Sequence, residues 1–171
     1  NDDYEWEKYI PHNELPTIIN PEEGFIATAN NKIVDDSYPY HISHVWAQPY
    51  RQQRILEILN SKDTFTVEDM KELQMDIKNL QAEEFVPIFL EQLSKQTLNE
   101  QEQEAVALLK EWDFEDDQAE TAPLLFQTIL LEISNVLFGE VISDEMMELF
   151  EGKTQVIDEL IRRANEGNEG P

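Results

Sequence analysis

Cysteine is absent from all 171 residues of this chain. That absence excludes disulfide bonds, thiol catalysis and thiolate metal sites. Basic residues are also scarce, because 12 lysines and arginines stand against 37 aspartates and glutamates, a formal net charge of −25. A surface of that charge repels phosphate backbones and anionic lipids. We therefore expect neither nucleic acid nor a membrane as a partner.

Long hydrophobic runs and recognised phosphate-binding or nucleotide-binding motifs are missing too. No apolar run approaches the roughly 20 residues that span a bilayer. The opening NDDYEWEKYI has acids where a signal peptide needs a basic region, and it does not begin with Met. We therefore expect a piece of a longer protein. Asn1 is not Ser, Thr or Cys, so it cannot act as an N-terminal nucleophile.

Two kinds of pattern divide the chain. Residues 1–48 hold short apolar runs between proline-containing turn signals, which predicts a strand-and-turn arm. Residues 49–165 show helical apolar spacing, and residues 166–171 read as a disordered tail. The predicted fold class is mainly α, a multi-helix domain with a short strand-bearing N-terminal arm. The arm has too few strands to close a sheet, so we expect its partner strands elsewhere in a longer protein.

Capping residues predict where the first two helices begin and end. Pro49 suits the first turn of a helix that ends at Asn60. Thr66 and Asp69 match the spacing of a capping box, in which each side chain bonds the other residue's backbone N–H. A second helix is therefore expected to start after Thr66.

The second helix is predicted to run from 66 to 93, with a kink or a split at Pro87. Within it Gln74 and Asp76 interrupt an apolar face, and we expect them to be paired in a contact with the arm. Residues 121–139 are apolar on more than one side. They predict a buried central helix.

Two groups of side chains contain residue types that can bind a metal. His41 and His44 are near Asp35 and Asp36, but no established metal-binding pattern includes them, so turn or interface roles are favoured. The acidic run DFEDDQAETAPL differs from a calcium loop at its sixth and twelfth positions and reads as a solvated loop. No metal ligand is assigned.

Adjacent asparagines end the apolar run GFIATA, at positions 30 and 31. Asparagine has poor strand propensity, and a buried amide is costly unless its donors and acceptors are paired. Arg51 and Arg54 follow on one predicted helix face. Either they pair with surface acids, or one of them lies against the asparagine-rich stretch.

The segments ELPTIINPEEGFIATANNKI, YPYHISHVWAQPYRQQRILEIL, TVEDMKELQMDIKNLQA and ALLKEWDF together resemble the penicillin acylase (penicillin amidase) family of N-terminal-nucleophile hydrolases. The similarity covers roughly residues 5–117 with recognisable motifs and the later helices less specifically. It identifies the chain as an internal fragment of that family's large (beta) subunit. The arm would then belong to the α/β/β/α sheet of the full-length enzyme.

The resemblance implies a parent protein that hydrolyses a linear acyl amide through an acyl-enzyme. In the family a precursor cuts itself into two subunits and exposes a nucleophilic N-terminal residue. The partners implied are the small subunit, the remainder of the large subunit and a small-molecule acyl amide. This chain lacks the nucleophile, so we expect it to be inactive alone. Phenylacetyl, aliphatic acyl and homoserine-lactone substrates all remain open.

The resemblance also assigns residues. Asn30 matches the family's oxyanion donor, and Arg51 matches an arginine that orders the active site. Asn31, Gln74 and Asp76 are assigned supporting positions around them. No cofactor is assigned, because the acid through which many members bind calcium is not matched here. Family members are usually secreted or periplasmic. The alternative is a non-catalytic helical domain for interaction or structure that retains only the fold.

Overall fold

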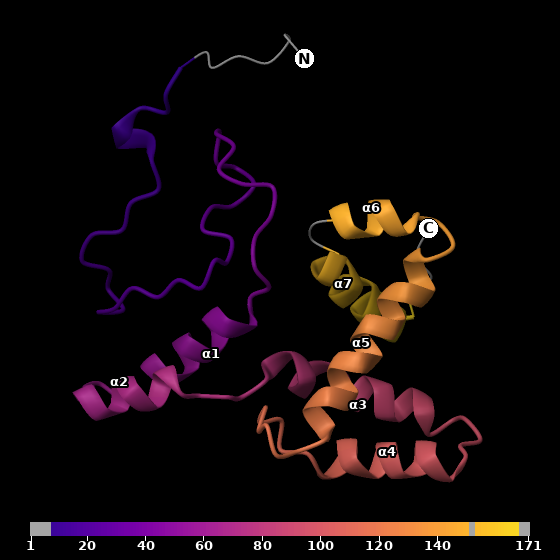
Figure 1. Ribbon diagram of the computed structural model, residues 1–171. Helices are drawn as coiled ribbons and strands as arrows, with labels where there is room; N and C mark the ends of the chain where they lie inside the picture. Colours follow the sequence, from indigo (N-terminus) through magenta and orange to yellow (C-terminus); the bar gives the residue numbers. More distant parts are fainter. Residues whose placement is uncertain (1–7, 151–152, 168–171) are drawn as a thin grey trace.

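A computed structural model describes residues 8–150 and 153–167 (Figure 1). The prediction of a mainly helical chain is confirmed. Asn1 and residues 168–171 lie outside the described residues, and residues 166 and 167 form a turn. In chain order the α-helices are α1 (Tyr50–Leu59), α2 (Val67–Gln74), α3 (Leu80–Leu93), α4 (Glu100–Glu111), α5 (Ala122–Phe138), α6 (Asp144–Leu149) and α7 (Lys153–Asn165).

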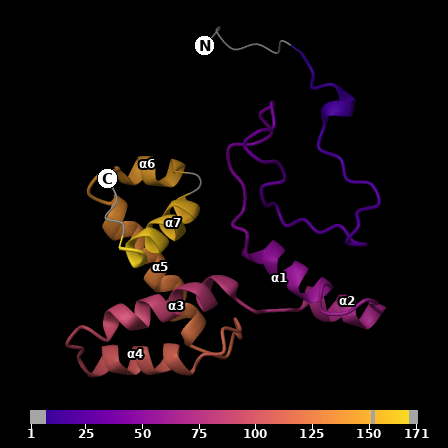
Figure 2. The ribbon, with the colours of Figure 1, turned by 180° about the vertical axis from the view of Figure 1, so that it is seen from behind.

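The arm before α1 is extended and irregular. Across residues 8–49 the one regular element is the short 3-10 helix η1 (His12–Glu14), and the expected strands do not form. A strand needs a neighbour with which to exchange backbone hydrogen bonds, and no described segment pairs with the arm in this way. Figures 1 and 2 show the arm as a wide loop that returns to α1, and its last residues contact α7, through Trp46 and Gln48.

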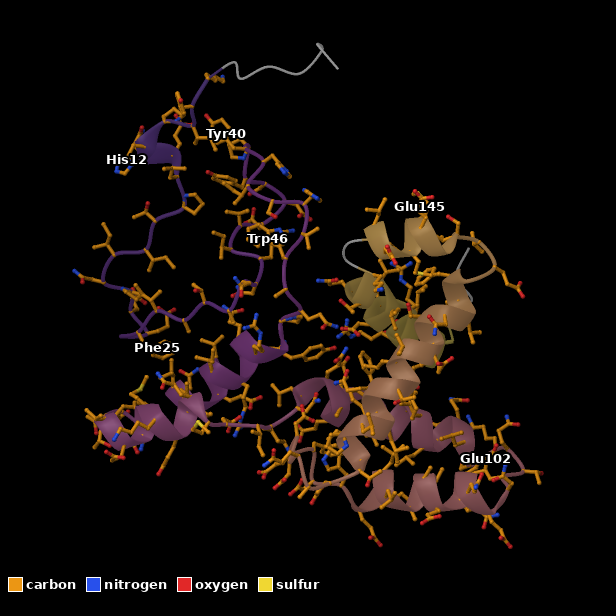
Figure 3. All side chains as sticks on the ribbon, in the orientation of Figure 1. His12, Phe25, Tyr40, Trp46, Glu102 and Glu145 are labelled. Carbon is orange, nitrogen blue, oxygen red and sulfur yellow. The ribbon has the colours of Figure 1, made fainter. Side chains whose placement is uncertain are left out.

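Tyrosine hydroxyls close the end of the arm that is far from α1. Tyr38 donates to the backbone oxygen of Glu14 over 2.8 Å, and Tyr40 donates to the Glu14 carboxylate. Figure 3 shows Tyr40 and His12 together at this end, whereas Trp46 lies on the segment that returns toward α1. Hydrogen bonds from two tyrosine side chains to the backbone and the side chain of Glu14 thus hold the loop.

The hydrophobic core lies among α3, α4 and α5. Phe85 of α3 and Phe126 of α5 are both fully buried, and the rings of Trp112 and Phe126 are 5.9 Å apart. Helix α7 packs against α5, and α1 contacts α3. The buried apolar residues of this core are Ala82, Phe85, Val86, Leu109, Trp112, Ala122 and Phe126.

Helix α5 is central, but it is buried along one side only. Its buried residues are Ala122, Phe126 and Ser134. Leu124, Leu131 and Val136 are 68%, 56% and 76% exposed. The expected buried central helix is therefore only partly buried, because α5 packs against α4 and α7 while these three apolar side chains face solvent. No helix of the described part is both long and apolar enough to cross a membrane.

The predicted long helix is interrupted at residues 75–79 rather than at Pro87, which lies inside α3. Backbone pairing with the acidic loop causes the interruption. Asn79 donates its N–H to Phe114 over 2.7 Å, and Asp116 donates its N–H to Ile77 over 2.9 Å. The Asn79 side chain also accepts from a backbone N–H at the start of α3. The acidic segment thus pairs with this connection in addition to joining two helices.

The capping predictions for the first two helices are confirmed. Asn60 is the C-cap of α1. Thr66 and Asp69 form both bonds of the capping box at the start of α2. Such caps require only residues three positions apart, so the local sequence suffices to place them.

Candidate active site

Asn30 occupies a turn rather than the end of a strand. Its φ of 60° lies in the left-handed region, which asparagine tolerates better than most residues. The N–H of Ala47 donates to the Asn30 backbone oxygen over 2.8 Å. The Asn30 side chain itself is exposed at the surface.

Asn31 points inward and is only 6% exposed. Its Oδ1 accepts from the N–H of Ala29 over 3.0 Å, and its Nδ2 donates to the backbone oxygen of Lys32 over 3.0 Å. Both ends of the buried amide are therefore paired, as burial requires. Asn31 fixes the backbone conformation that presents Asn30.

Arg51, in the first turn of α1, connects that helix to the asparagine pair. Its Nη2 donates to the Ala29 backbone oxygen and to Asn30 Oδ1, each over 3.0 Å. Because a guanidinium has donors only, it selects the oxygen of the Asn30 amide. Among the described residues no acceptor binds the Asn30 Nδ2, so that NH2 group is available to donate. Arg51 also borders a cleft of about 380 Å³ together with Ala47 and Tyr50.

Arg54 forms a separate ion pair one helical turn later. Its Nε and Nη2 donate to the two carboxylate oxygens of Asp76 over 2.9 and 2.7 Å. Hydrogen bonds from Arg54 lower the pKa of Asp76, although partial burial opposes this. The pair joins α1 to the α2–α3 connection, so the expected contact of Asp76 with the arm is not formed. Gln74 is exposed and takes no part in it.

Both alternatives for the two arginines thus apply, one to each residue. Arg51 lies against the asparagine pair, while Arg54 pairs with acids, including Glu57 at 3.2 Å. The two side chains bind different parts of the chain, the asparagine pair and the α2–α3 connection. Arg51 is the one that reaches the residue assigned to oxyanion binding.

The residues considered for a metal have other contacts. The rings of His41 and His44 stack with centroids 6.1 Å apart. Asp35 accepts from the Ser37 N–H over 2.8 Å, and Asp36 pairs with a lysine. Across the described ranges no three His, Asp or Glu side chains are grouped in a way that could hold a metal ion.

Sequence reasoning missed the residues that attach the start of α1 to the helical body. Tyr50 contacts both Glu84 of α3 and Asp158 of α7. Arg162, in the last turn of α7, binds Glu84 as well. The one sequence signal for this attachment was Asp158, an acid beside the apolar Ile157 on the last helix. That pattern is too common to identify a buried contact.

Comparison with known proteins gives a match to one family over nearly the whole chain. A sequence model described as penicillin amidase matches residues 1–169. The matched range includes the asparagine pair, Arg51 and the helical body.

Individual relatives match over shorter stretches. The penicillin acylase 2 proenzyme of Pseudomonas sp. (strain SE83) is 38% identical over 74 residues, which is 43% of this chain and 10% of that protein. The acyl-homoserine lactone acylase QuiP of Pseudomonas aeruginosa (strain PAO1) is 27% identical over 77 residues, 45% of this chain and 9% of that protein. The aligned parts of this chain thus span about a tenth of these relatives' lengths.

Proposed function

This chain belongs to the penicillin amidase family, and on that premise we propose that its parent protein is an amidohydrolase acting on a linear acyl amide. The reaction passes through an acyl-enzyme. This chain supplies the Asn30 side chain as a hydrogen-bond donor to the oxyanion of the tetrahedral intermediate. The nucleophile comes from another part of the parent protein, so the chain alone is inactive.

The observation that carries this proposal is the bond from Arg51 to the amide oxygen of Asn30, at 3.0 Å. An oxyanion needs a donor, and only the nitrogen end of an amide can donate. Arg51 occupies the oxygen end, which orients the nitrogen end away from itself. A donor that is already oriented does not reorganise when charge develops, and removing one such donor from an enzyme costs about a hundredfold to a thousandfold in turnover.

Asn31 and the turn around it support this donor. Asn31 fixes the turn from inside, as its two hydrogen bonds within residues 29–32 indicate. Gln74 and Asp76 are proposed only as supporting residues around the site. Asp76 would act through Arg54 by holding α1 against the α2–α3 connection.

The arm itself would join the layered catalytic sheet of the parent protein, apart from the helical domain at 49–165. It is extended, and four of its isoleucines lie open to solvent: Ile18 at 61%, Ile19 at 78%, Ile26 at 58% and Ile33 at 50% exposed. Apolar side chains on an unpaired extended segment are suited to a neighbouring strand. The partners are then the small subunit and the remainder of the large subunit of the same precursor. Amides of the arm that have no partner in this chain, unlike those of Ala29 and Ala47, should exchange slowly in the parent protein and rapidly in this chain.

The test is Asn30→Asp in the full-length parent, assayed with chromogenic phenylacetyl, aliphatic acyl and homoserine-lactone amides. The substitution keeps the size of the side chain and replaces the NH2 donor with a charged oxygen. We expect turnover to fall at least a hundredfold while the two subunits still form. Asn20→Asp is the matched control, because Asn20 is also exposed in the arm at positive φ, 49°, and it should retain full turnover.

Near-normal turnover in Asn30→Asp would contradict the assignment. The intact mass of the expressed parent protein distinguishes the hydrolase from the alternative, a non-catalytic helical domain. Two chains with a new N-terminal Ser, Thr or Cys support the hydrolase, whereas one unprocessed and inactive chain supports a helical domain for interaction or structure. Export to the periplasm or medium is proposed from family membership, and cell fractionation tests it.

A further inference from the structure

Residues 46–51 make contacts in two directions. Ala47 and Arg51 bind the asparagine turn, through the backbone oxygen and the side-chain oxygen of Asn30. The residues that alternate with them bind α7. Trp46 does so through its backbone oxygen, and Gln48 and Tyr50 do so through their side chains. This short segment therefore connects the candidate site to the last helix.

Asp158 is the residue of α7 on which these contacts converge, and it is 2% exposed. Gln48 donates to its Oδ2 over 2.6 Å, and Gln81 of α3 donates to its Oδ1 over 2.8 Å. The Tyr50 hydroxyl lies 3.0 Å from the same Oδ2. Burial raises the pKa of Asp158, and these three hydrogen bonds oppose that rise. A buried carboxylate is costly unless it is bonded in this way.

Tyr50 is held from three sides. Its hydroxyl lies 3.0 Å from carboxylate oxygens of Glu84 and Asp158 and can donate its one proton to either. Arg162 donates to the same hydroxyl over 2.9 Å and binds Glu84 through Nε and Nη2 over 2.6 and 2.9 Å. The first helical residue of α1 is thus attached to both α3 and α7.

We propose that Asp158 is a positioning residue for the candidate active site. By holding Gln48 and Tyr50, it fixes the start of α1, and Arg51 then fixes the direction of the Asn30 amide. The effect on catalysis rests on the proposed function. The effect on the position of Asn30 does not, since it follows from contacts within this chain.

The arrangement differs from what stability alone requires. A buried ion or polar cluster can often be replaced by apolar side chains with no loss of stability. Here the Asp158 carboxylate binds Tyr50, which directly precedes Arg51, and Gln48, two residues earlier. Displacing a catalytic group by about 1 Å can cost about a hundredfold in rate. A small shift of the start of α1 would therefore move Arg51 and, through it, the Asn30 amide.

The first experiment is NMR on this chain with Asp158→Ala. We expect the side-chain NH2 signals of Asn30 and the backbone amide signal of Ala47 to move or broaden. Glu159→Ala is the matched control for charge, because it removes the neighbouring but exposed acid of α7. Leu109→Ala is the control for stability, because it creates a cavity in the core at α4. Both controls should leave the two signals in place.

Unchanged Asn30 and Ala47 signals in Asp158→Ala would overturn the proposal. If that variant does not fold, Tyr50→Phe decides, because it keeps the ring and removes the hydroxyl that contacts Asp158. It should shift the same signals, and unchanged signals there would overturn the proposal too. Asp158→Asn retains an acceptor and should give a smaller shift than Asp158→Ala. A shift as large as that of alanine would contradict a role for the hydrogen bonds.

The second experiment measures kcat and KM in the full-length parent. We expect Asp158→Ala to lower kcat about tenfold to a hundredfold, with KM within about twofold, and Leu109→Ala to leave kcat unchanged at a temperature where it is folded. A kcat equal to that of the parent would contradict the catalytic part of the proposal. If the unmodified parent shows no turnover although the NMR signals shift, the proposed function fails and the positioning role stands.

Discussion

The arm and the α3–α5 core belong to one chain but are stabilised in different ways. In the core, Phe85 and Phe126 are fully buried against other apolar side chains. In the arm, Asn31 is buried with its amide paired, while Ile19 and Ile26 are 78% and 58% exposed. The core thus buries its own apolar surface, whereas polar contacts define the conformation of the arm and leave its apolar residues at the surface.

This difference indicates what each region can do alone. Apolar burial is the main favourable term in folding, so the helical body has its own source of stability. Hydrogen bonds add less, about 1 kcal/mol each, but they are directional and fix which way a group points. The candidate site lies in the region held by directional contacts, where orientation matters most.

The largest expected effect is on the core side of the comparison. Phe126→Ala should lower the free energy of unfolding by about 3–5 kcal/mol, because it removes a buried ring and leaves a cavity. Val136→Ala, on the same helix but 76% exposed, should change it by less than about 0.5 kcal/mol. Denaturant unfolding followed by circular dichroism measures both. Equal effects would mean that α5 is not anchored along one face.

A smaller and more local effect is expected in the arm. Asn31→Ala leaves the buried Ala29 N–H without its partner, at a cost of about 1–3 kcal/mol. Hydrogen exchange should therefore speed up at Ala29, while amides of the core keep their protection. Asn13→Ala, at an exposed position of η1, serves as the control. Loss of protection in the core as well would show that the two regions unfold together.

The smallest effect concerns the helix cap between the two regions. A hydrogen bond from Lys62, followed by bonds from Thr66, lowers the pKa of Asp69 from its ordinary 3.8 to about 2. The carboxylate therefore stabilises α2 above about pH 4, and this contribution is lost as the pH falls toward 2. NMR titration of the Asp69 carboxyl and of the Thr66 amide measures it.

Asp69→Asn is the control for this titration, because it should make the Thr66 amide insensitive to pH over the same window. A midpoint for Asp69 near 3.8 would instead show that the cap and its lysine contribute no stabilisation in solution. Neither result affects the core, since α2 makes no contact with Phe126 or its neighbours in the core cluster.

Features that depend on neighbouring residues were predictable from the sequence. The capping box of Thr66 and Asp69 and the C-cap at Asn60 involve residues within one helical turn. The mainly helical fold class was also predictable, because apolar periodicity is local. The family resemblance, which the match over residues 1–169 confirms, rested on short motifs of the same kind.

At two places, contacts between segments gave a result that differs from the prediction based on the local sequence pattern. Pro87 predicted a kink or split, yet the break falls at residues 75–79, because the acidic loop pairs with that connection. The apolar sequence of α5 predicted a buried central helix, but Leu124, Leu131 and Val136 are exposed among the described residues. Neither result follows from the segment itself, since each depends on which other segment lies beside it.

Residue types and local spacing were enough to predict the acidic surface, the absence of thiol chemistry, the helix caps and the asparagine pair as an unusual feature. Tertiary structure decided that Arg51 selects the oxygen of the Asn30 amide and that Asp158 holds the residues around it. The partners Gln48 and Asp158 are 110 positions apart. Contacts of that span have no local signature, because they form only when α7 packs beside the start of α1.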